Sequence, residues 1–250
     1  MHKPQSSSTV PLLAHRGYAA QYPENTLEAL TAAVDAGATL LEFDIQLTRD
    51  QVPILLHDAD FSRTGDSSER AMDIDFVRTQ TMSVGEVGKF GEAFASTRAP
   101  ALEVVAEALQ GWPDVTAFVE IKRQSLEHFG VAAVLDAVLP VLSSVINQCV
   151  VISFNAEVLF EVKERFDVRT GWALRRYAED ARRMAQQLSP DYLFCNETKL
   201  PPRSEPLWPG IWEWVVYEIV DPPLARDLIE RGVGIIETKD YVNMANALRE

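Results

Sequence analysis

The feature that most constrains the fold is a regular alternation of short apolar segments with longer segments of helical periodicity along most of the chain. The strand-like segments fall at 10–14, 39–45, 115–121, 149–154, 168–174, 192–195, 212–220 and 232–238. Strands separated by helices form parallel sheets, because a parallel connection needs a crossover. Eight such units over 250 residues predict an α/β fold of the (β/α)8 TIM barrel type. A doubly wound sheet would usually have fewer strands and a glycine-rich first turn.

Helical patterns occupy most of the intervals between these strands. They are predicted at 24–38, 100–112, 125–142, 155–166, 178–188, 222–232 and 241–248. In the first, Leu27, Leu30 and Val34 fall on one helix face and Asn25 stands where an N-cap belongs. Segment 201–212 is too rich in proline and tryptophan for an ordinary helix, so we expect one barrel helix to be short or missing there.

One polar stretch interrupts the alternation. Residues 58–98 have only a weak helical pattern, and we interpret them as an insertion. We found no internal sequence repeat or low-complexity tract that would divide the chain. We therefore expect a single domain over residues 1–250 that contains this insertion.

Charge and composition narrow the function classes. The chain has 23 basic and 37 acidic residues, a net charge of -14, which disfavours binding to nucleic acid or to an anionic membrane. No segment has the roughly 18 apolar residues of a membrane helix, and residues 1–17 lack the apolar core of a signal peptide. Cys149 and Cys195 form no CxxC pair, so we expect buried free thiols and a cytoplasmic location. The lack of a long apolar segment predicts no stable membrane insertion.

The stretch LEFDIQLTRDQVPILLHDAD, residues 41–60, places acidic side chains and a histidine in an apolar context. About six residues separate its two apolar arms, too few for a parallel crossover, so the second arm should return as an antiparallel hairpin. If Arg49 and Asp50 form a two-residue turn, His57 lies opposite Glu42, on the face that also carries Asp44. A turn one residue longer would reverse that relation, and the sequence leaves the register open.

Barrel active sites lie at the carboxyl ends of the strands, and the first three such ends read AHRG, LEFD and FVEIK. These motifs bring together His15, Arg16, Glu42, Asp44, Glu120 and Lys122. The three carboxylates repel one another unless a cation holds them, and an all-oxygen set favours Mg²⁺ or Ca²⁺. The two basic side chains would hold a phosphate, and His15 with His57 would supply an acid and a base. The combination predicts phosphoester hydrolysis.

Each motif also has a plainer interpretation. An HRG tripeptide recurs by chance, and Glu120 with Lys122 is equally typical of an ion pair on one strand face. Asp58 could orient the His57 ring or simply begin a loop. Trp172 fits either the core or an apolar wall at the barrel mouth.

Taken together and in order, the motifs AHRG, PENTLEAL, LEFDIQLTRD, VPILLHD, RAPALEVV and FVEIK resemble those of the glycerophosphodiester phosphodiesterases. The resemblance covers the N-terminal three fifths of the chain well. It implies a (β/α)8 barrel that hydrolyses glycerophosphodiesters to glycerol 3-phosphate and an alcohol. It assigns acid-base catalysis to His15 and His57, phosphate contact to Arg16 and Lys122, and a divalent cation to Glu42, Asp44 and Glu120.

The chain departs from the family pattern at three notable positions. Gln51 replaces a glycine after the hairpin aspartate, and a glutamine tolerates a positive φ poorly. Val220 stands where asparagine is usual, and Lys239 lies roughly where aspartate is usual. We expect these last two positions to alter the glycerol or alcohol side of the pocket. Glu218 is an extra acid there, suited to an amine head group or to a salt bridge with an arginine.

The sequence is also compatible with other functions. The enzyme could act on lysophospholipids or another non-glycerol diester, which would need an apolar trench, or the barrel could bind a phosphorylated ligand without turnover. Because the histidine and carboxylate set is intact, we rank ligand binding without turnover below the two enzymatic functions. The aromatic segment 206–214 fits a homo-oligomer contact, a substrate wall or core packing equally well. The expected partner is a small-molecule glycerophosphodiester, and the metal identity and head group are undetermined.

Overall fold

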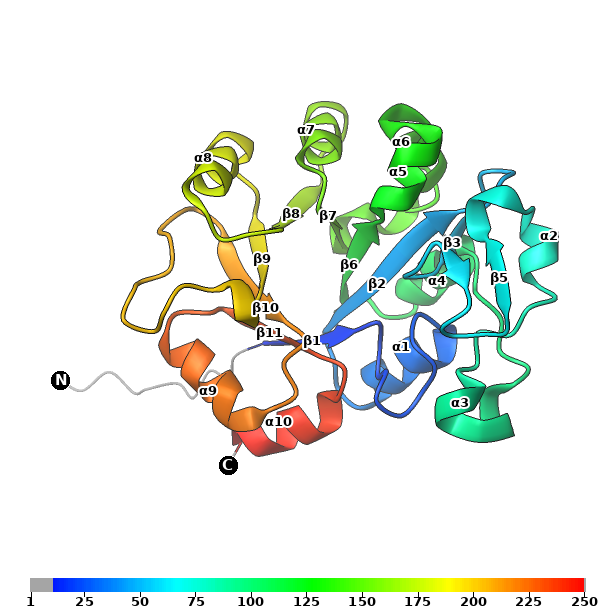
Figure 1. Cartoon of the computed structure of the whole chain (residues 1–250), viewed down its shortest axis with the longest axis horizontal. Coiled ribbons are helices and arrows are strands. Elements are labelled where there is room, and N and C mark those ends of the chain that lie inside the picture. Colours follow the sequence, from blue (N-terminus) through cyan, green and yellow to red (C-terminus); the bar gives the residue numbers. More distant parts are fainter. Residues whose placement is uncertain (1–10, 250) are drawn as a thin grey trace.

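A closed parallel barrel forms the centre of the computed structural model, which describes residues 11–249 (Figure 1). Its strands in the described part of the chain are β1 (Leu12–His15), β2 (Leu40–Leu47), β6 (Thr116–Ile121), β7 (Cys149–Ser153), β8 (Arg169–Ala173), β9 (Tyr192–Asn196), β10 (Glu213–Tyr217) and β11 (Ile235–Thr238). Each pairs in parallel with its neighbours, and β1 pairs with both β2 and β11, which closes the ring. The predicted eight-stranded barrel is confirmed.

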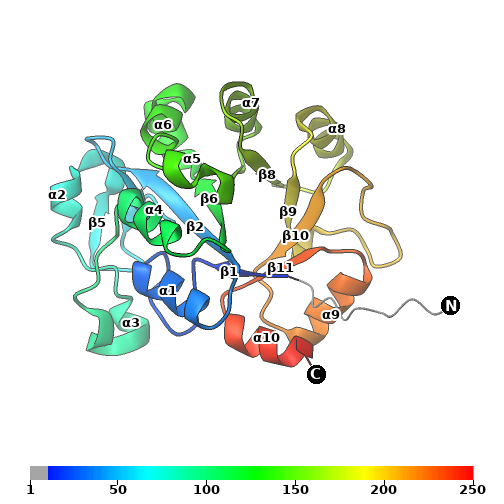
Figure 2. The same cartoon turned by 180° about the vertical axis from the view of Figure 1, so that it is seen from behind.

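Helices surround the ring on its outer side (Figures 1 and 2). They are α1 (Leu27–Asp35), α4 (Leu102–Gln110), α5 (Arg123–Phe129), α6 (Val131–Val138), α7 (Ala156–Arg165), α8 (Glu179–Leu188), α9 (Pro222–Glu230) and α10 (Tyr241–Arg249). Short 3-10 turns precede β7 (η3, Ser143–Gln148) and follow β9 (η4, Glu197–Lys199). Within residues 11–249, no helix is long and apolar enough to cross a bilayer.

Two helix expectations were wrong in detail. Segment 125–142 is not one helix, because Gly130 adopts φ 84° and ψ 158° and separates α5 from α6. The N-cap of α1 is Thr26, whose hydroxyl accepts a hydrogen bond from the Ala29 N–H, and Asn25 has another role described below. As expected, no helix forms between residues 201 and 212.

The alternation of side chains along each strand separates two cores. Outward-facing residues such as Phe43 and Val119 pack under the helices in the larger cluster. Inward-facing residues such as Leu13, Phe118 and Ile235 fill the barrel interior. Because successive strand residues point to opposite faces, this pattern directs the acidic positions of β2, β6 and β11 inward, toward the barrel axis.

The hairpin register differs from the two-residue turn that we considered. β3 (Pro53–Leu55) pairs antiparallel to β2 with Ile45 opposite Leu55, so Thr48 faces Val52 across a three-residue loop. Gln51 takes φ 60° in this loop, the left-handed position expected of the missing glycine. His57 therefore is not the partner of Glu42. It follows the end of β3 and reaches the site from a bend.

Between β3 and α4 lie β4 (Asp60–Phe61), β5 (Ser67–Arg70), η1 (Ala71–Asp73), α2 (Phe76–Thr79), α3 (Val87–Phe90) and η2 (Gly91–Phe94). These elements sit together on the side of the barrel away from α8 and α9 (Figures 1 and 2). They share a small buried cluster that includes Phe61, Met72 and Val84. We propose that residues 58–98 are an insertion within a single barrel domain.

Candidate active site

The predicted site residues gather at the carboxyl ends of β1, β2 and β6. His15 pairs in register with Glu42, and Asp44 pairs with Glu120 on the neighbouring strand. His15, Arg16, His57, Glu120 and Lys122 line one cavity of about 410 Å³. Parallel strands end at the same rim, which is why motifs far apart in the sequence meet here.

Three carboxylates lie close enough to share a cation. Glu42, Asp44 and Glu120 each offer an oxygen, and these oxygens lie within 4.8 Å of one another. Glu42 and Asp44 are buried, each with 1% exposure. Burial and the neighbouring Asp44 and Glu237 raise the pKa of Glu42 well above its ordinary value, and burial also raises that of Glu120. Such a cluster is costly without a compensating positive charge.

The protein's own cations compensate only part of this charge. Lys122 Nζ lies 3.1 Å from an Asp44 oxygen and 2.7 Å from a Glu120 oxygen. Arg16 Nε lies 3.0 Å from Asp44 Oδ2. Burial opposes ionisation of Asp44, yet Lys122 and Arg16 outweigh it and hold the pKa of Asp44 far below its usual range.

Of the three carboxylates, Glu42 is the one that forms no ion pair with Lys122 or with the Arg16 guanidinium. Its Oε2 accepts the Arg16 backbone N–H at 3.0 Å, while its Oε1 is buried and has no hydrogen-bond partner. A buried carboxylate oxygen without a partner, beside two further carboxylates, is what a hard divalent cation requires. The residues present therefore fit a hard divalent cation such as Mg²⁺ or Ca²⁺.

The two histidines occupy different environments. His15 Nε2 lies 3.9 Å from Glu42 and 3.8 Å from Glu237, and burial with the nearby Arg16 lowers the pKa of His15 to about 3. His57 is half-buried, and burial lowers its pKa as well. Its Nδ1 lies 2.7 Å from Asp58 Oδ1. Because His57 and Arg63 hold the pKa of Asp58 low despite partial burial, this carboxylate accepts and the ring carries its proton on Nδ1.

Sequence reasoning missed Glu237. This residue of β11 is buried, lines the same cavity and forms a second possible cation set with His15 and Glu42. Burial and Glu120 raise its pKa well above the ordinary value. The signal was present: Glu237 sits near the end of the last predicted strand and alternates with the outward-facing Ile236, as Glu42 alternates with Phe43.

Asn25 is the second residue whose role was not foreseen. Its Nδ2 donates to Asp44 Oδ2 at 2.8 Å, and its Oδ1 accepts the Asp44 backbone N–H at 3.0 Å. Asn25 adopts φ 55°, a left-handed conformation that asparagine tolerates better than most residues. The PENT motif thus supplies a side chain that fixes Asp44 instead of capping α1.

Two of the three departures from the family pattern lie at a neighbouring cavity. Val220 and Lys239 line a space of about 390 Å³ that shares His15, Arg16 and Glu218 with the first cavity. Glu218 accepts a hydrogen bond from Asn196 Nδ2 at 2.8 Å, and no arginine salt bridge to it is present among the described residues. Trp172, with 8% exposure, belongs to the core.

Comparison with known proteins identifies the family to which the chain belongs. The model of the glycerophosphoryl diester phosphodiesterase family matches residues 15–231. The chain belongs to this family. The family match runs from the first histidine of the site through β10 and α9, so it also covers the part of the chain where sequence motifs were faint.

Several phosphodiesterases resemble the chain in sequence. Mouse glycerophosphodiester phosphodiesterase 1 is 34% identical over 157 residues, which are 62% of this chain and 46% of that protein. A glycerophosphodiester phosphodiesterase from Caldanaerobacter subterraneus is 31% identical over 153 residues, 61% of each chain. The chain therefore spans about half the length of the mammalian relatives it matches.

Solved phosphodiesterases of low identity share the fold. An Oleispira antarctica phosphodiesterase in complex with the product sn-glycerol-3-phosphate aligns with a TM-score of 0.81 at 21% identity, over 97% of this chain and 98% of that one. A Thermotoga maritima glycerophosphodiester phosphodiesterase aligns with a TM-score of 0.74 at 22% identity, over 96% and 99%. Both support the barrel assignment.

Proposed function

We propose that the protein hydrolyses glycerophosphodiesters to glycerol 3-phosphate and an alcohol, with the aid of a divalent cation. The observation that carries this proposal is that His15 and His57 line one cavity with Arg16 and Lys122, beside three mutually close carboxylates. This arrangement joins an acid-base pair, cations for a phosphate and a cation site within one barrel mouth. The relatives from mouse and Caldanaerobacter subterraneus are glycerophosphodiester phosphodiesterases, which supports the same reaction.

In this proposal, Arg16 and Lys122 hold the anionic phosphate, while Glu42, Asp44 and Glu120 hold the cation. When bound, the cation stabilises negative charge that develops on the phosphate oxygens. Both guanidinium and ammonium groups sit beside carboxylates that keep them in place, so little reorganisation is needed when the substrate enters.

His15 and His57 act as a pair. One ring, as the neutral imidazole, takes a proton from the attacking hydroxyl, either water or the glycerol 2-hydroxyl, and the other, as the protonated imidazolium, gives a proton to the leaving alkoxide. If a cyclic phosphate forms first, the two roles reverse in the second half-reaction. Asp58 fixes the His57 tautomer with its proton on Nδ1, so Nε2 is the nitrogen that exchanges a proton with the substrate.

Kinetics of site variants would test this function. Release of glycerol 3-phosphate from glycerophosphocholine and glycerophosphoethanolamine would be followed with Mg²⁺, Ca²⁺ or EDTA. Removing an acid-base group costs roughly 10²–10⁴-fold in kcat, so we expect losses of that size in His15→Ala and His57→Ala. His128→Ala is the matched control, because His128 packs against Phe129 on α5 outside the cavity. Equal activity in all three variants would refute the assignment.

A lysophospholipid diester is the second substrate class. Ile152, Phe154, Phe194 and Tyr217 give the 410 Å³ cavity an apolar wall, which favours inclusion of such diesters in the assay. Turnover of lysophospholipids without turnover of glycerophosphodiesters would replace the primary assignment. Binding of a phosphorylated ligand with no turnover of either class would support the non-catalytic alternative.

We also propose a cytoplasmic location. Cys149 and Cys195 are both buried and unpaired, and burial raises each thiol pKa to about 12, so neither is a reactive thiolate. Free buried thiols are typical of a reducing compartment. Localisation of a tagged full-length protein would test this proposal. Finding the protein in an oxidising compartment would contradict it.

A further inference from the structure

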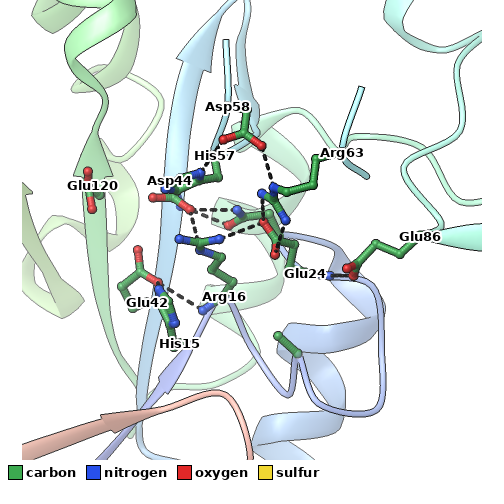
Figure 3. Close-up of polar contacts among 12 residues, drawn as sticks. His15, Arg16, Glu24, Glu42, Asp44, His57, Asp58, Arg63, Glu86 and Glu120 are labelled. Carbon is green, nitrogen blue, oxygen red and sulfur yellow. Dashed lines mark hydrogen bonds and ion pairs between the residues drawn. The ribbon is translucent and has the colours of Figure 1, made fainter. Parts of the chain in front are cut away.

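Arg63 belongs to the insertion, between β4 and β5, yet its guanidinium reaches two acids at the edge of the site (Figure 3). Its Nε donates to Asp58 Oδ2 at 2.6 Å. Its two terminal nitrogens donate to the two oxygens of Glu24 at 2.9 and 2.6 Å. A planar guanidinium with all three nitrogens engaged has a defined orientation.

Each of these two acids also contacts a proposed site residue at the barrel mouth. Asp58 contacts His57 Nδ1 through its other oxygen, at 2.7 Å. Glu24 Oε1 also accepts from Arg16 Nη1 at 2.9 Å (Figure 3). Arg63 therefore lies one residue away from the proposed catalytic histidine on one side and from the proposed phosphate-binding arginine on the other.

The charged groups that link Arg63 to the site depend on one another. Glu24 is largely buried between two guanidinium groups, and without its carboxylate Arg16 and Arg63 would repel. Without Arg63, the Glu24 charge would act on Arg16 alone and compete with the substrate phosphate for that side chain. Asp58 would lose the partner that fixes its rotamer, and the His57 ring would lose its defined orientation.

The insertion supports Arg63 with a second contact to the same segment. Glu86 Oε2 accepts the Glu24 backbone N–H at 2.9 Å, and the Glu86 N–H donates to Thr64 O at 2.8 Å. At Gly65 an added Cβ would lie 2.1 Å from Ser83 O, so only glycine permits this close approach of two loops. The backbone on either side of Arg63 is thus held against the barrel.

An isolated surface salt bridge contributes little and would not carry an inference. Arg63 differs because its contact with Glu24 is bidentate, and the Glu24 side chain is only 11% exposed. We propose that Arg63 is a positioning residue, which fixes His57 through Asp58 and Arg16 through Glu24. This inference rests on the proposed function, and it gives the insertion a role in assembling the site.

Three variants test the inference. Arg63→Ala removes the hydrogen bonds to both Asp58 and Glu24. Arg63→Lys keeps the positive charge, but a lysine ammonium cannot reproduce the planar guanidinium bonds to both acids. Arg78→Ala is the matched control, because Arg78 makes a comparable bond of 2.6 Å to Glu69 within the insertion and reaches no site residue. Misplacement of a catalytic group by about 1 Å can cost about 10²-fold, so we expect kcat to fall about 10–100-fold in Arg63→Ala.

The expected kinetic pattern is specific. KM should change less than kcat, Arg63→Lys should fall between Arg63→Ala and wild type, and Arg78→Ala should match wild type. Added guanidinium at non-denaturing concentration should restore part of the kcat of Arg63→Ala. Wild-type kcat in both Arg63 variants would overturn the inference, as would an equal loss in Arg78→Ala.

A second readout does not depend on turnover. Imidazole ¹⁵N shifts of His57 should report a fixed Nδ1–H tautomer in wild type and Arg78→Ala, and a mixture of tautomers in Arg63→Ala and in Asp58→Asn. An unchanged tautomer in Arg63→Ala overturns the inference even if the enzyme is inactive toward every diester. If Arg63→Ala fails to fold, Arg63→Lys carries the same test, while Asp58→Asn tests the Asp58–His57 contact on which the inference depends. Absence of wild-type turnover would instead refute the proposed function.

Discussion

Asn25 and Asp44 are joined by two hydrogen bonds, one from the Asn25 amide to the Asp44 carboxylate and one from the Asp44 backbone N–H to the Asn25 oxygen. The two residues come from different elements, the loop before α1 and the strand β2. Asp44 also contacts Arg16 and Lys122, so it is the carboxylate around which the proposed phosphate-binding cations are arranged.

Replacing Asn25 with glycine should destabilise the protein by about 2 kcal/mol, because a buried bond to a charged carboxylate is lost. Glycine accepts φ 55° without strain, so this variant removes the side chain and keeps the backbone. Asn25→Ala should cost more, because alanine also resists that φ. Urea unfolding would measure both free energies, and a loss in Asn25→Gly below about 0.5 kcal/mol would contradict a structural role for this pair.

Glu42→Gln should separate charge repulsion from cation binding. At pH 8 in EDTA the variant should unfold at a higher temperature than wild type, because the wild-type carboxyl must either carry a buried charge beside Asp44 or take up a proton at a cost in free energy, and glutamine does neither. It should gain little from added Mg²⁺ or Ca²⁺, whereas the stability of wild type should rise with the logarithm of cation concentration once that concentration exceeds the dissociation constant.

Glu103→Gln serves as the control for Glu42→Gln, since Glu103 is an exposed glutamate of α4. It should keep the wild-type response to cations. Equal stabilisation of Glu42→Gln and wild type by the cation would exclude Glu42 from the site.

The pH dependence of stability should reveal the Glu24 carboxylate. Burial alone would raise its pKa, but Arg63 and Arg16 lower it to about 2 from an ordinary 4.5. A carboxyl group with a lowered folded-state pKa stabilises the protein above the unfolded pKa, and that contribution disappears as pH falls from 4.5 to about 2.

The difference in unfolding free energy between wild type and Glu24→Gln isolates this contribution from the other acids. The difference should be constant near neutral pH and shrink steadily below pH 4.5. Urea titrations at several pH values would measure it. A difference that grows on acidification would show that the Glu24 pKa is raised.

Gln51→Gly should stabilise the hairpin by about 0.5–1 kcal/mol, because a left-handed non-glycine residue is strained by about 1–2 kcal/mol and glycine loses part of that gain to entropy. Gln51→Ala should give no such gain, since alanine meets the same strain. A destabilised Gln51→Gly would mean that the glutamine side chain contributes contacts beyond its backbone conformation.

Much of the barrel was predictable because periodicity is a local property. The β2 alternation of Leu41 and Phe43 with Glu42 and Asp44 was enough to direct the acids inward, and the same logic applied to Glu120. The hairpin register was not predictable, because two-residue and three-residue loops both satisfy the sequence. The choice depends on a positive φ at Gln51 that this residue type does not signal.

Side-chain contacts between distant segments were the other limit. Arg63 and Glu24 lie 39 positions apart, and nothing in either motif specifies their two-point contact. Asn25 resembled a helix cap because capping and carboxylate binding use the same side chain. Glu237 was predictable from the sequence, because its alternation with Ile236 directs it inward as Glu42 is directed in β2.

Cation-dependent hydrolysis through His57 is best tested by a ³¹P NMR time course of purified protein with glycerophosphocholine and Mg²⁺, repeated with EDTA and with His57→Ala. We expect the diester signal to be replaced by that of glycerol 3-phosphate only in the first sample. Persistence of the diester in the cation-loaded wild type, or equal conversion in EDTA, would contradict it.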